Sequence, residues 1–166
     1  MTHFVTLHIT FIDHPYSSLS AGGKVRIIQE ENFNLTSLWQ IDLPVLNRYS
    51  DNPFLNPSLG LTMDYGLNER VELFGAVQFN TSKSEENRIL DADLALGSNF
   101  SINDKTALFI EYFYSRPFNV SGESYQPING GLTYLITPKL QFDLYAGFGL
   151  NRSTNHFWGT GLAILF

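Results

Sequence analysis

A carboxylate stands between two aromatic residues in the stretch "TALFIEYFY", where Phe109, Glu111 and Phe113 occupy alternate positions. In an extended strand these three side chains point to one face, because successive side chains alternate between faces. They would form an apolar constriction that carries one charge. A buried carboxylate with a purely structural hydrogen bond would have the same sequence, so both interpretations stay open. Glu111 is the acid that we select as the functional candidate.

Catalytic chemistry has little support in the sequence. The histidines His3, His8, His14 and His156 are dispersed and show no paired metal-ligand spacing. Ser153 and His156 share one loop region, but two polar residues beside a hairpin are far more often loop residues than members of a triad. The stretch "GFGLN" lies inside a predicted strand and lacks the helix of a nucleotide site. We therefore predict no enzyme, no cofactor and no metal site.

The composition limits the classes of partner. The net charge of −6 argues against nucleic acid, because neutralising phosphates requires lysine and arginine. Charged residues make up 16% of the chain, below the roughly 25% of soluble globular proteins, whereas aromatic residues reach 14%. The chain has no cysteine, which excludes disulfides and thiolate metal sites. Its length of 166 residues suits a single domain, residues 1–166.

The dominant pattern has a period of two, which is typical of strands with one apolar face. In "KLQFDLYAGFGL" the even-numbered residues 140–150 are apolar, and the other face carries Gln141, Asp143, Tyr145, Gly147 and Gly149. Similar strands are predicted near residues 3–11, 23–31, 35–43, 57–66, 69–80, 88–100, 105–115, 127–137, 139–150 and 155–166. Long polar connections alternate with short turns. We therefore expect an all-β, up-and-down antiparallel barrel of about ten strands, or of about twelve if the natural chain is longer.

Alternation alone does not say whether the apolar face points inward, as in a soluble barrel, or outward to lipid. Three observations favour lipid. The predicted strands are close to the roughly 9–11 tilted residues that cross a hydrocarbon core. The less apolar face has few lysines, unlike a water-exposed surface. The apolar face is free of charge in the clearest strands, as expected where a basic residue at the midplane costs about 2–4 kcal/mol. A transmembrane barrel in a lipid bilayer is therefore the expected class.

This orientation places a set of charged residues in the lumen. The lumen-facing candidates are Lys24, Arg26, Asp42, Asp64, Glu72, Asp91, Asp93, Glu111 and Asp143. An acid-weighted interior would favour cations, because low-dielectric walls focus the field, although most of these acids are expected to be structural. The aromatic residues expected to form interfacial girdles on the outward face are Trp39, Tyr65, Tyr112, Tyr114, Tyr145 and Trp158.

The chain ends on "TGLAILF", in which Gly161, Ile164 and Phe166 resemble the C-terminal insertion signal of outer-membrane barrels. That resemblance implies the outer-membrane assembly machinery as a partner during insertion. Gly159 stands where the signal usually has a polar residue. The opening "MTHFVTLHITF" lacks the basic and uninterrupted apolar regions of a secretory signal peptide. We expect a location in the outer membrane of a Gram-negative bacterium, a signal peptide that is not present in this chain, and both termini on the periplasmic side.

Several longer stretches carry a family resemblance. "GGLTYLITPKLQFDLYAGFGLN", "FWGTGLAILF", "GGKVRI", "LWQIDLP" and "FIEYFY" resemble the outer-membrane transporter-like β-barrel family associated with phenol-degradation pathways, a family of presumed channels. The chain departs from the family at residues 43–46, where it has "LPVL" and the family tends to have Leu-Pro-Thr-Gly. The resemblance implies an outer-membrane barrel that passes small compounds, apolar or aromatic ones among them.

The expected function is therefore a small passive channel or transporter-like pore for small-molecule solutes. The first alternative is a structural or interaction barrel with a plugged lumen, whose long loops bind partners. The second is a soluble barrel that binds an apolar ligand inside. A lipid-modifying barrel enzyme ranks below both, since it would need polar groups converging at one lip of the barrel.

Overall fold

The computed structural model describes the chain except for residues 1–3, 11–15, 48–54, 84–87 and 165–166. Its strands are β1 (Phe4–Thr10), β2 (Tyr16–Gln29), β3 (Phe33–Asn47), β4 (Asn56–Asn68), β5 (Val71–Lys83), β6 (Arg88–Asn103), β7 (Thr106–Pro117), β8 (Pro127–Thr137), β9 (Leu140–Gly149) and β10 (Phe157–Ile164). The largest departure from the predicted ranges is β2, which begins at Tyr16 rather than near residue 23. Its first half, "YSSLSAGG", has few apolar residues and is a strand because it pairs with both β1 and β3.

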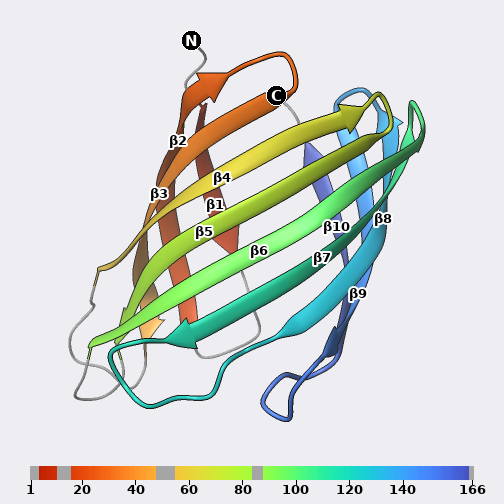
Figure 1. Ribbon diagram of the computed structural model, residues 1–166. Coiled ribbons are helices and arrows are strands. Elements are labelled where there is room, and N and C mark those ends of the chain that lie inside the picture. Colours follow the sequence, from red (N-terminus) through yellow and green to blue (C-terminus); the bar gives the residue numbers. More distant parts are fainter. Residues whose placement is uncertain (1–3, 11–15, 48–54, 84–87, 165–166) are drawn as a thin grey trace.

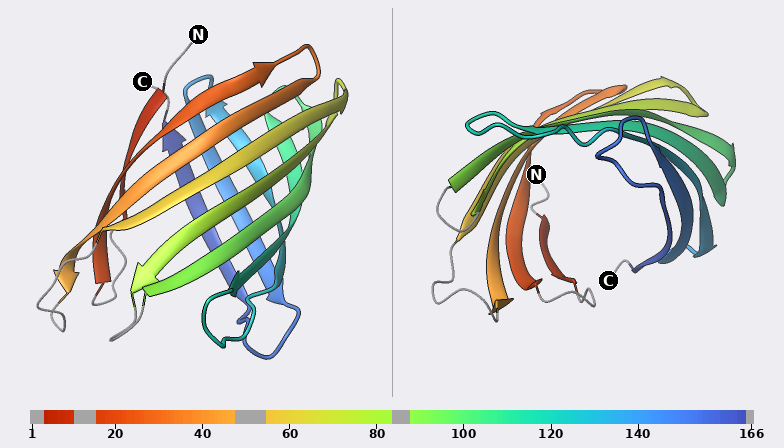
Figure 2. Two further views of the ribbon diagram at one scale, coloured as in Figure 1. Left: turned by 60° about the vertical axis from the view of Figure 1, so that its left-hand side comes forward. Right: turned by 90° about the horizontal axis from the view of Figure 1, so that it is seen from below.

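All the described strands belong to one sheet, in which each strand pairs antiparallel with the next along the chain (Figure 1). The sheet is rolled so that its first and last strands face each other across an opening (Figure 2). The predicted all-β, up-and-down antiparallel order is therefore confirmed. Within the described ranges no pairing joins β1 to β10, so closure of the barrel remains a prediction.

Short turns connect the strands at one end of the sheet, and in two of them an asparagine side chain accepts hydrogen bonds from the backbone of the turn. The side-chain oxygen of Asn68 accepts hydrogen bonds from the backbone N–H groups of Arg70 (2.9 Å) and Val71 (3.0 Å). Asn103 does the same for Lys105 and Thr106 in the β6–β7 turn. Such Asx turns satisfy backbone donors that a tight reversal leaves free. The start of β1 and the end of β10 lie at this short-turn end (Figure 1).

The last two long connections interlock at the opposite end. The backbone N–H of Gln126 donates to the Thr154 hydroxyl (2.8 Å), and the Asn151 amide donates to the carbonyl of Ser124 (2.7 Å). The Thr154 side chain is buried, with only 5% of its surface exposed. The segments 118–126 and 150–156 therefore form one hydrogen-bonded unit.

The two faces of the sheet differ in exposure as well as in chemistry. On β4, Leu59, Leu61, Met63 and Tyr65 are 41–60% exposed, whereas the intervening residues Ser58, Thr62 and Asp64 are buried or half-buried. Side chains converge on the concave face of a rolled sheet and shield one another, while they diverge on the convex face. The apolar face is therefore the outer, convex one.

The exposure of the apolar side chains favours a membrane barrel over a water-soluble barrel that binds a ligand inside. Among the described residues, no hydrophobic side chain forms a buried core. A water-soluble barrel would bury its apolar face, because burying apolar surface is the main driving force of folding in water. No helix in the described part of the chain is long and apolar enough to cross a membrane.

Candidate lumenal site

The strand register assigns every charged residue predicted for the lumen to one face of the sheet. Residues paired directly across two strands share a face, as do residues two apart along one strand. Asp64 pairs with Phe74, Phe74 pairs with Gly97, and Gly97 pairs with Glu111. The same alternation places the remaining candidates on this inner face: Lys24 and Arg26 on β2, Asp42 on β3, Glu72 on β5, Asp91 and Asp93 on β6, and Asp143 on β9.

Glu111 lies within a continuous row of paired residues on the inner face. The row runs through Asn34, Asp64, Phe74, Gly97, Glu111, Asn129, Gly147 and Phe157, from β3 to β10. Phe109 and Phe113 flank Glu111 along β7 and are half-buried. The structure therefore brings together the two rings and the carboxylate that the sequence singled out.

Five of the seven acids on the inner face accept hydrogen bonds from neutral amide side chains. The donor and acceptor pairs are Gln40 with Asp42 (2.8 Å), Asn99 with Glu72 (3.0 Å), Asn129 with Glu111 (2.9 Å), Gln141 with Asp143 (2.7 Å), and Asn80 with Asp93. An amide supplies a hydrogen bond without a positive charge, so it satisfies a carboxylate oxygen and leaves the charge in place. The charge of these acids is therefore not neutralised by their hydrogen-bond partners.

A pair of acids lies toward the long-loop end of β6. The Asp91 carboxylate accepts a long hydrogen bond of 3.4 Å from Ser82, and Asn80 bonds one oxygen of Asp93. The other oxygen of Asp93 is buried and has no hydrogen-bond partner among the described residues. A buried, unpaired carboxylate oxygen is costly unless water or a cation reaches it. This part of the inner face consequently has an acceptor without a partner among the described residues.

Aromatic rings on the inner face lie over glycines of the neighbouring strand. A Cβ added to Gly97 would overlap the ring of Phe74, and one added to Gly147 would overlap the ring of Phe157. These glycines make room for rings that cover the backbone of the next strand, an arrangement that helps to fix strand register. The inner wall therefore combines acids, amides and aromatic surface.

Tyr145 is the one girdle prediction that the structure contradicts. Its ring lies over Gly159 and meets Phe157 edge-on, with centroids 6.3 Å apart, on the face that carries Asp143. Position parity decides the face of a strand residue, so the general preference of tyrosine for interfaces does not apply here. Tyr145 is an inner-face residue, and its assignment to the outward girdle was wrong.

The other predicted girdle residues occupy outward positions. Trp39 and Tyr65 are close to half exposed, and Trp158 is 80% exposed at the start of β10. Tyr114 lies near the long-loop end of β7, whereas Tyr112 lies midway along that strand. Their role as membrane anchors stays a prediction. Further outward aromatic residues, not predicted for the girdles, include the exposed Phe79, Phe100, Tyr134 and Phe148.

The amide partners of the acids are the functional residues that sequence reasoning missed. Two of them stand two positions from their acid, in "QID" and "QFD", so the period of two was a usable signal. Asn99 and Glu72 are separated by 27 residues and meet only through the register of β5 and β6.

The residues considered for catalysis take part in loop structure. The Ser153 hydroxyl donates to the carbonyl of Ser124 (2.7 Å), and His156 Nδ1 accepts from the backbone N–H of Gly149 (3.2 Å). No group of three or more histidine, cysteine or acidic residues in the described part could hold a metal ion. Of the predicted insertion signal, Gly161 and Ile164 lie on β10, and Phe166 lies outside the described residues.

An antiparallel up-and-down sheet with an apolar outer face and a polar inner face is the architecture of outer-membrane β-barrels. A family model described as "Putative MetA-pathway of phenol degradation" matches residues 16–166, and the chain belongs to that family. The resemblance noted in the sequence is thereby confirmed. No curated protein matches the chain in sequence.

Solved structures of one bacterial outer-membrane protein are similar in fold. OmpTdeltaL8, a loop-deletion mutant of OmpT from Vibrio cholerae, superposes with a TM-score of 0.63 at 13% identity, over 98% of this chain and 58% of that one. In-vitro folded OmpT in its trimer form gives 0.59 at 13% identity, over 98% and 60%. This chain therefore spans less than two thirds of those proteins, and the likeness concerns the fold alone.

Proposed function

We propose that the chain forms an outer-membrane β-barrel through which small solutes pass passively, with cations and neutral compounds favoured over anions. The observation that carries the proposal is the pairing of lumenal acids with neutral amides, as in Asn129 with Glu111. Among the described residues, Lys24 and Arg26 are the basic residues on that face, against the seven acids. Field lines focus between low-dielectric walls, so an uncompensated excess of acids raises the local concentration of cations.

Closure of the sheet is part of this proposal. The edges of β1 and β10 face each other (Figure 2), and unpaired backbone groups are not tolerated in hydrocarbon. We infer that these edges pair when the apolar outer face is surrounded by lipid. The proposal includes insertion by the outer-membrane assembly machinery. It also puts the short-turn end of the sheet, where β1 starts and β10 ends (Figure 1), on the periplasmic side.

The solute class follows from the inner aromatic residues and from the family. Phe109, Phe113 and Phe74 present ring surface close to Glu111. Small aromatic compounds stack on such rings in offset or edge-to-face geometry. The family description refers to phenol degradation, which agrees with a neutral aromatic solute. No catalytic role is proposed.

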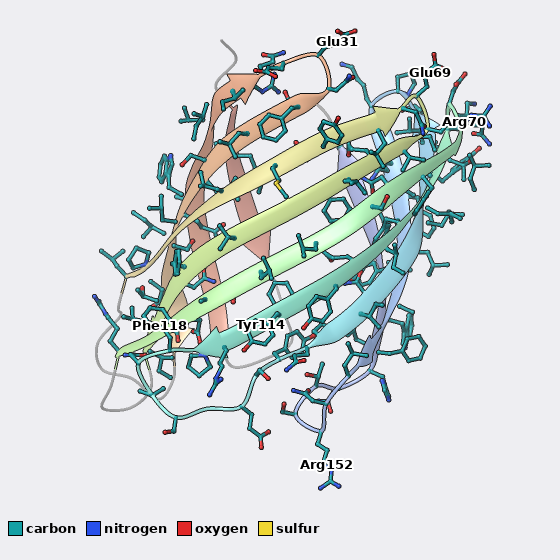
Figure 3. All side chains as sticks on the ribbon, viewed as in Figure 1. Glu31, Glu69, Arg70, Tyr114, Phe118 and Arg152 are labelled. Atoms are coloured by element: carbon teal, nitrogen blue, oxygen red, sulfur yellow. The ribbon has the colours of Figure 1, made fainter. Side chains whose placement is uncertain are left out.

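The selectivity is tested by single-channel recording of the folded protein in planar bilayers. In Glu111→Gln the carboxylate is replaced by a neutral isostere, and the reversal potential in a potassium chloride gradient should move toward that of an unselective pore. At about 8 Å through water, the carboxylate stabilises a cation by about 0.5 kcal/mol and destabilises an anion by about the same amount. Its removal should therefore lower the cation-to-anion permeability ratio roughly fivefold. Glu31→Gln, which removes the same charge at the tip of the β2–β3 turn (Figure 3), is the matched control and should have a smaller effect. Equal effects of the two variants would refute a selective role for Glu111.

The barrel itself is tested separately. Folding into detergent or lipid should give a β-type circular dichroism spectrum and a compact gel band that shifts on boiling. A monomer stable in buffer without detergent would support the soluble alternative instead. A folded barrel without conductance would support the plugged one.

A further inference from the structure

A groove lies on the outer side of the sheet at its long-loop end, away from the lumen. It has a volume of about 620 Å³, and its walls include Tyr114, Arg116, Phe118 and Asn119. We propose that this groove binds the phosphate headgroup of a phosphorylated lipid from the surrounding outer leaflet. The inference rests on the proposed membrane placement of the barrel but not on solute passage through its lumen.

Strand register shows that the groove belongs to the lipid-facing side. Ala92 pairs with Arg116 and also with Phe79, and Leu94 pairs with Tyr114. These residues have the same parity as Leu96, which is 45% exposed on the convex face. Figure 3 shows Tyr114 and Phe118 near the end of β7 from which the long β7–β8 connection leaves.

The wall of the groove is a loop segment that folds back along β6. The Phe118 N–H donates to the carbonyl of Leu90 (3.0 Å). The Asn119 side chain bonds both the N–H of Leu90 (2.8 Å) and the carbonyl of Arg88 (2.7 Å). The Phe118 ring then meets Phe79 edge-on, with centroids 6.3 Å apart. The groove is therefore built by specific bonds to an adjacent strand rather than by a free loop.

The charges around the groove favour an anion. Arg116 is exposed, and none of the described residues that line the groove is acidic. Arg88 has the same outward parity at the first position of β6. On the loop side, Arg116 also borders a separate cavity, whose described lining includes the charged residues Glu123 and Arg152. Arginine binds phosphate oxygens through parallel N–H donors, which suits it to a phosphate headgroup.

The apolar surface next to Arg116 favours a lipid over a soluble phosphate. Moving along the barrel from the Ala92–Arg116 row, the next outward rows hold Val77, Leu94 and Tyr114, and then Leu96 and Tyr112. An acyl chain would lie along these side chains while its phosphate reaches the guanidinium. Tyrosine, with an apolar ring and a polar tip, suits the depth at which headgroup meets hydrocarbon.

The test is native mass spectrometry of the folded protein in detergent, titrated with bisphosphorylated lipid A and, separately, with the same lipid after removal of its phosphates. We expect the phosphorylated lipid to bind more tightly, and Arg116→Gln to weaken its binding about tenfold or more, because a charge-assisted hydrogen bond is lost. Arg116→Lys should retain part of the affinity, since it keeps the charge but loses the parallel donors. Arg152→Gln is the charge-matched control and should bind as the unmodified protein does.

Three results would overturn the proposal: equal binding of the two lipids, unchanged binding by Arg116→Gln, or competition by inorganic phosphate as strong as that by lipid A. The heat-dependent gel shift of each variant shows that it is folded, and Arg116→Lys provides the comparison if Arg116→Gln does not fold. Lipid binding in detergent does not require conductance, so a failed conductance experiment and a failed binding experiment remain distinguishable.

Discussion

Gly147 should be a position where a single added methyl group destabilises the barrel. It is buried on β9, opposite Phe157 of β10. The three atoms nearest to a Cβ placed on Gly147 all belong to the Phe157 ring, and each is within 2.8 Å. The described glycines do not have positive φ angles, so alanine can adopt this backbone. The effect of Gly147→Ala is therefore steric contact with one ring rather than backbone strain.

The size of the effect follows from overpacking. Forcing a side chain from its packed position costs about 1–3 kcal/mol, and we expect Gly147→Ala to lower the free energy of unfolding by that amount. Gly66→Ala is the control, because the nearest atom to its added Cβ is 3.9 Å away. That substitution should leave the free energy of unfolding unchanged or raise it by about 0.4–1 kcal/mol, because alanine lowers the conformational entropy of the unfolded chain. Unfolding in urea from lipid vesicles, followed by tryptophan fluorescence, measures both.

A double-mutant cycle identifies the ring as the cause. Phe157→Ala removes the ring, so Gly147→Ala should cost much less in that background, with a coupling energy of about 0.5–3 kcal/mol. The reasoning is refuted if Gly147→Ala has the same effect whether or not the ring is present, or if it behaves as Gly66→Ala does.

Two further substitutions test the outer face and the lumen. Leu61→Arg, midway along β4 on the outer face, should destabilise the inserted barrel by about 2–4 kcal/mol. Leu67→Arg, near the β4–β5 turn, should cost only about 0–1 kcal/mol. Equal values for the two variants in the vesicle unfolding assay would contradict a membrane-embedded face. Asn129→Leu removes the amide that bonds Glu111 and should cost about 1–3 kcal/mol. In a Glu111→Leu background the loss should be smaller, and additive losses would show that the bond does not stabilise the barrel.

The fold was predictable from the sequence because strand alternation encodes it locally. Leu59, Leu61 and Met63 alternate with Ser58 and Thr62, and one face of such a strand is decided without reference to any neighbour. The assignment of Tyr145 failed where a residue-type preference was placed above that alternation, because parity with Asp143 already indicated the inner face.

The candidate site was predictable only in part, because pairing across strands depends on register. The bond between Asn99 and Glu72 requires knowing which residues of β5 and β6 lie opposite each other. The outer groove was not predictable, because it depends on Asn119 bonding back to Arg88 and Leu90 rather than extending into solvent. Nothing in the local sequence "RPFNVSG" specifies that partner.

Asparagine and glutamine also explain how the chain can be polar and yet contain so few charged residues. Asn68 and Asn103 satisfy backbone donors in the turns, Asn119 fastens a loop, and Asn99 and Asn129 bond lumenal acids. Because amides bond five of the seven acids of the inner face, those five do not need lysine or arginine as hydrogen-bond partners. The seven acids and two bases predicted for the lumen leave an excess of five negative charges, against a net charge of −6 for the whole chain. Most of the net charge of the protein therefore lies along the path proposed for the solute, where it can act on selectivity.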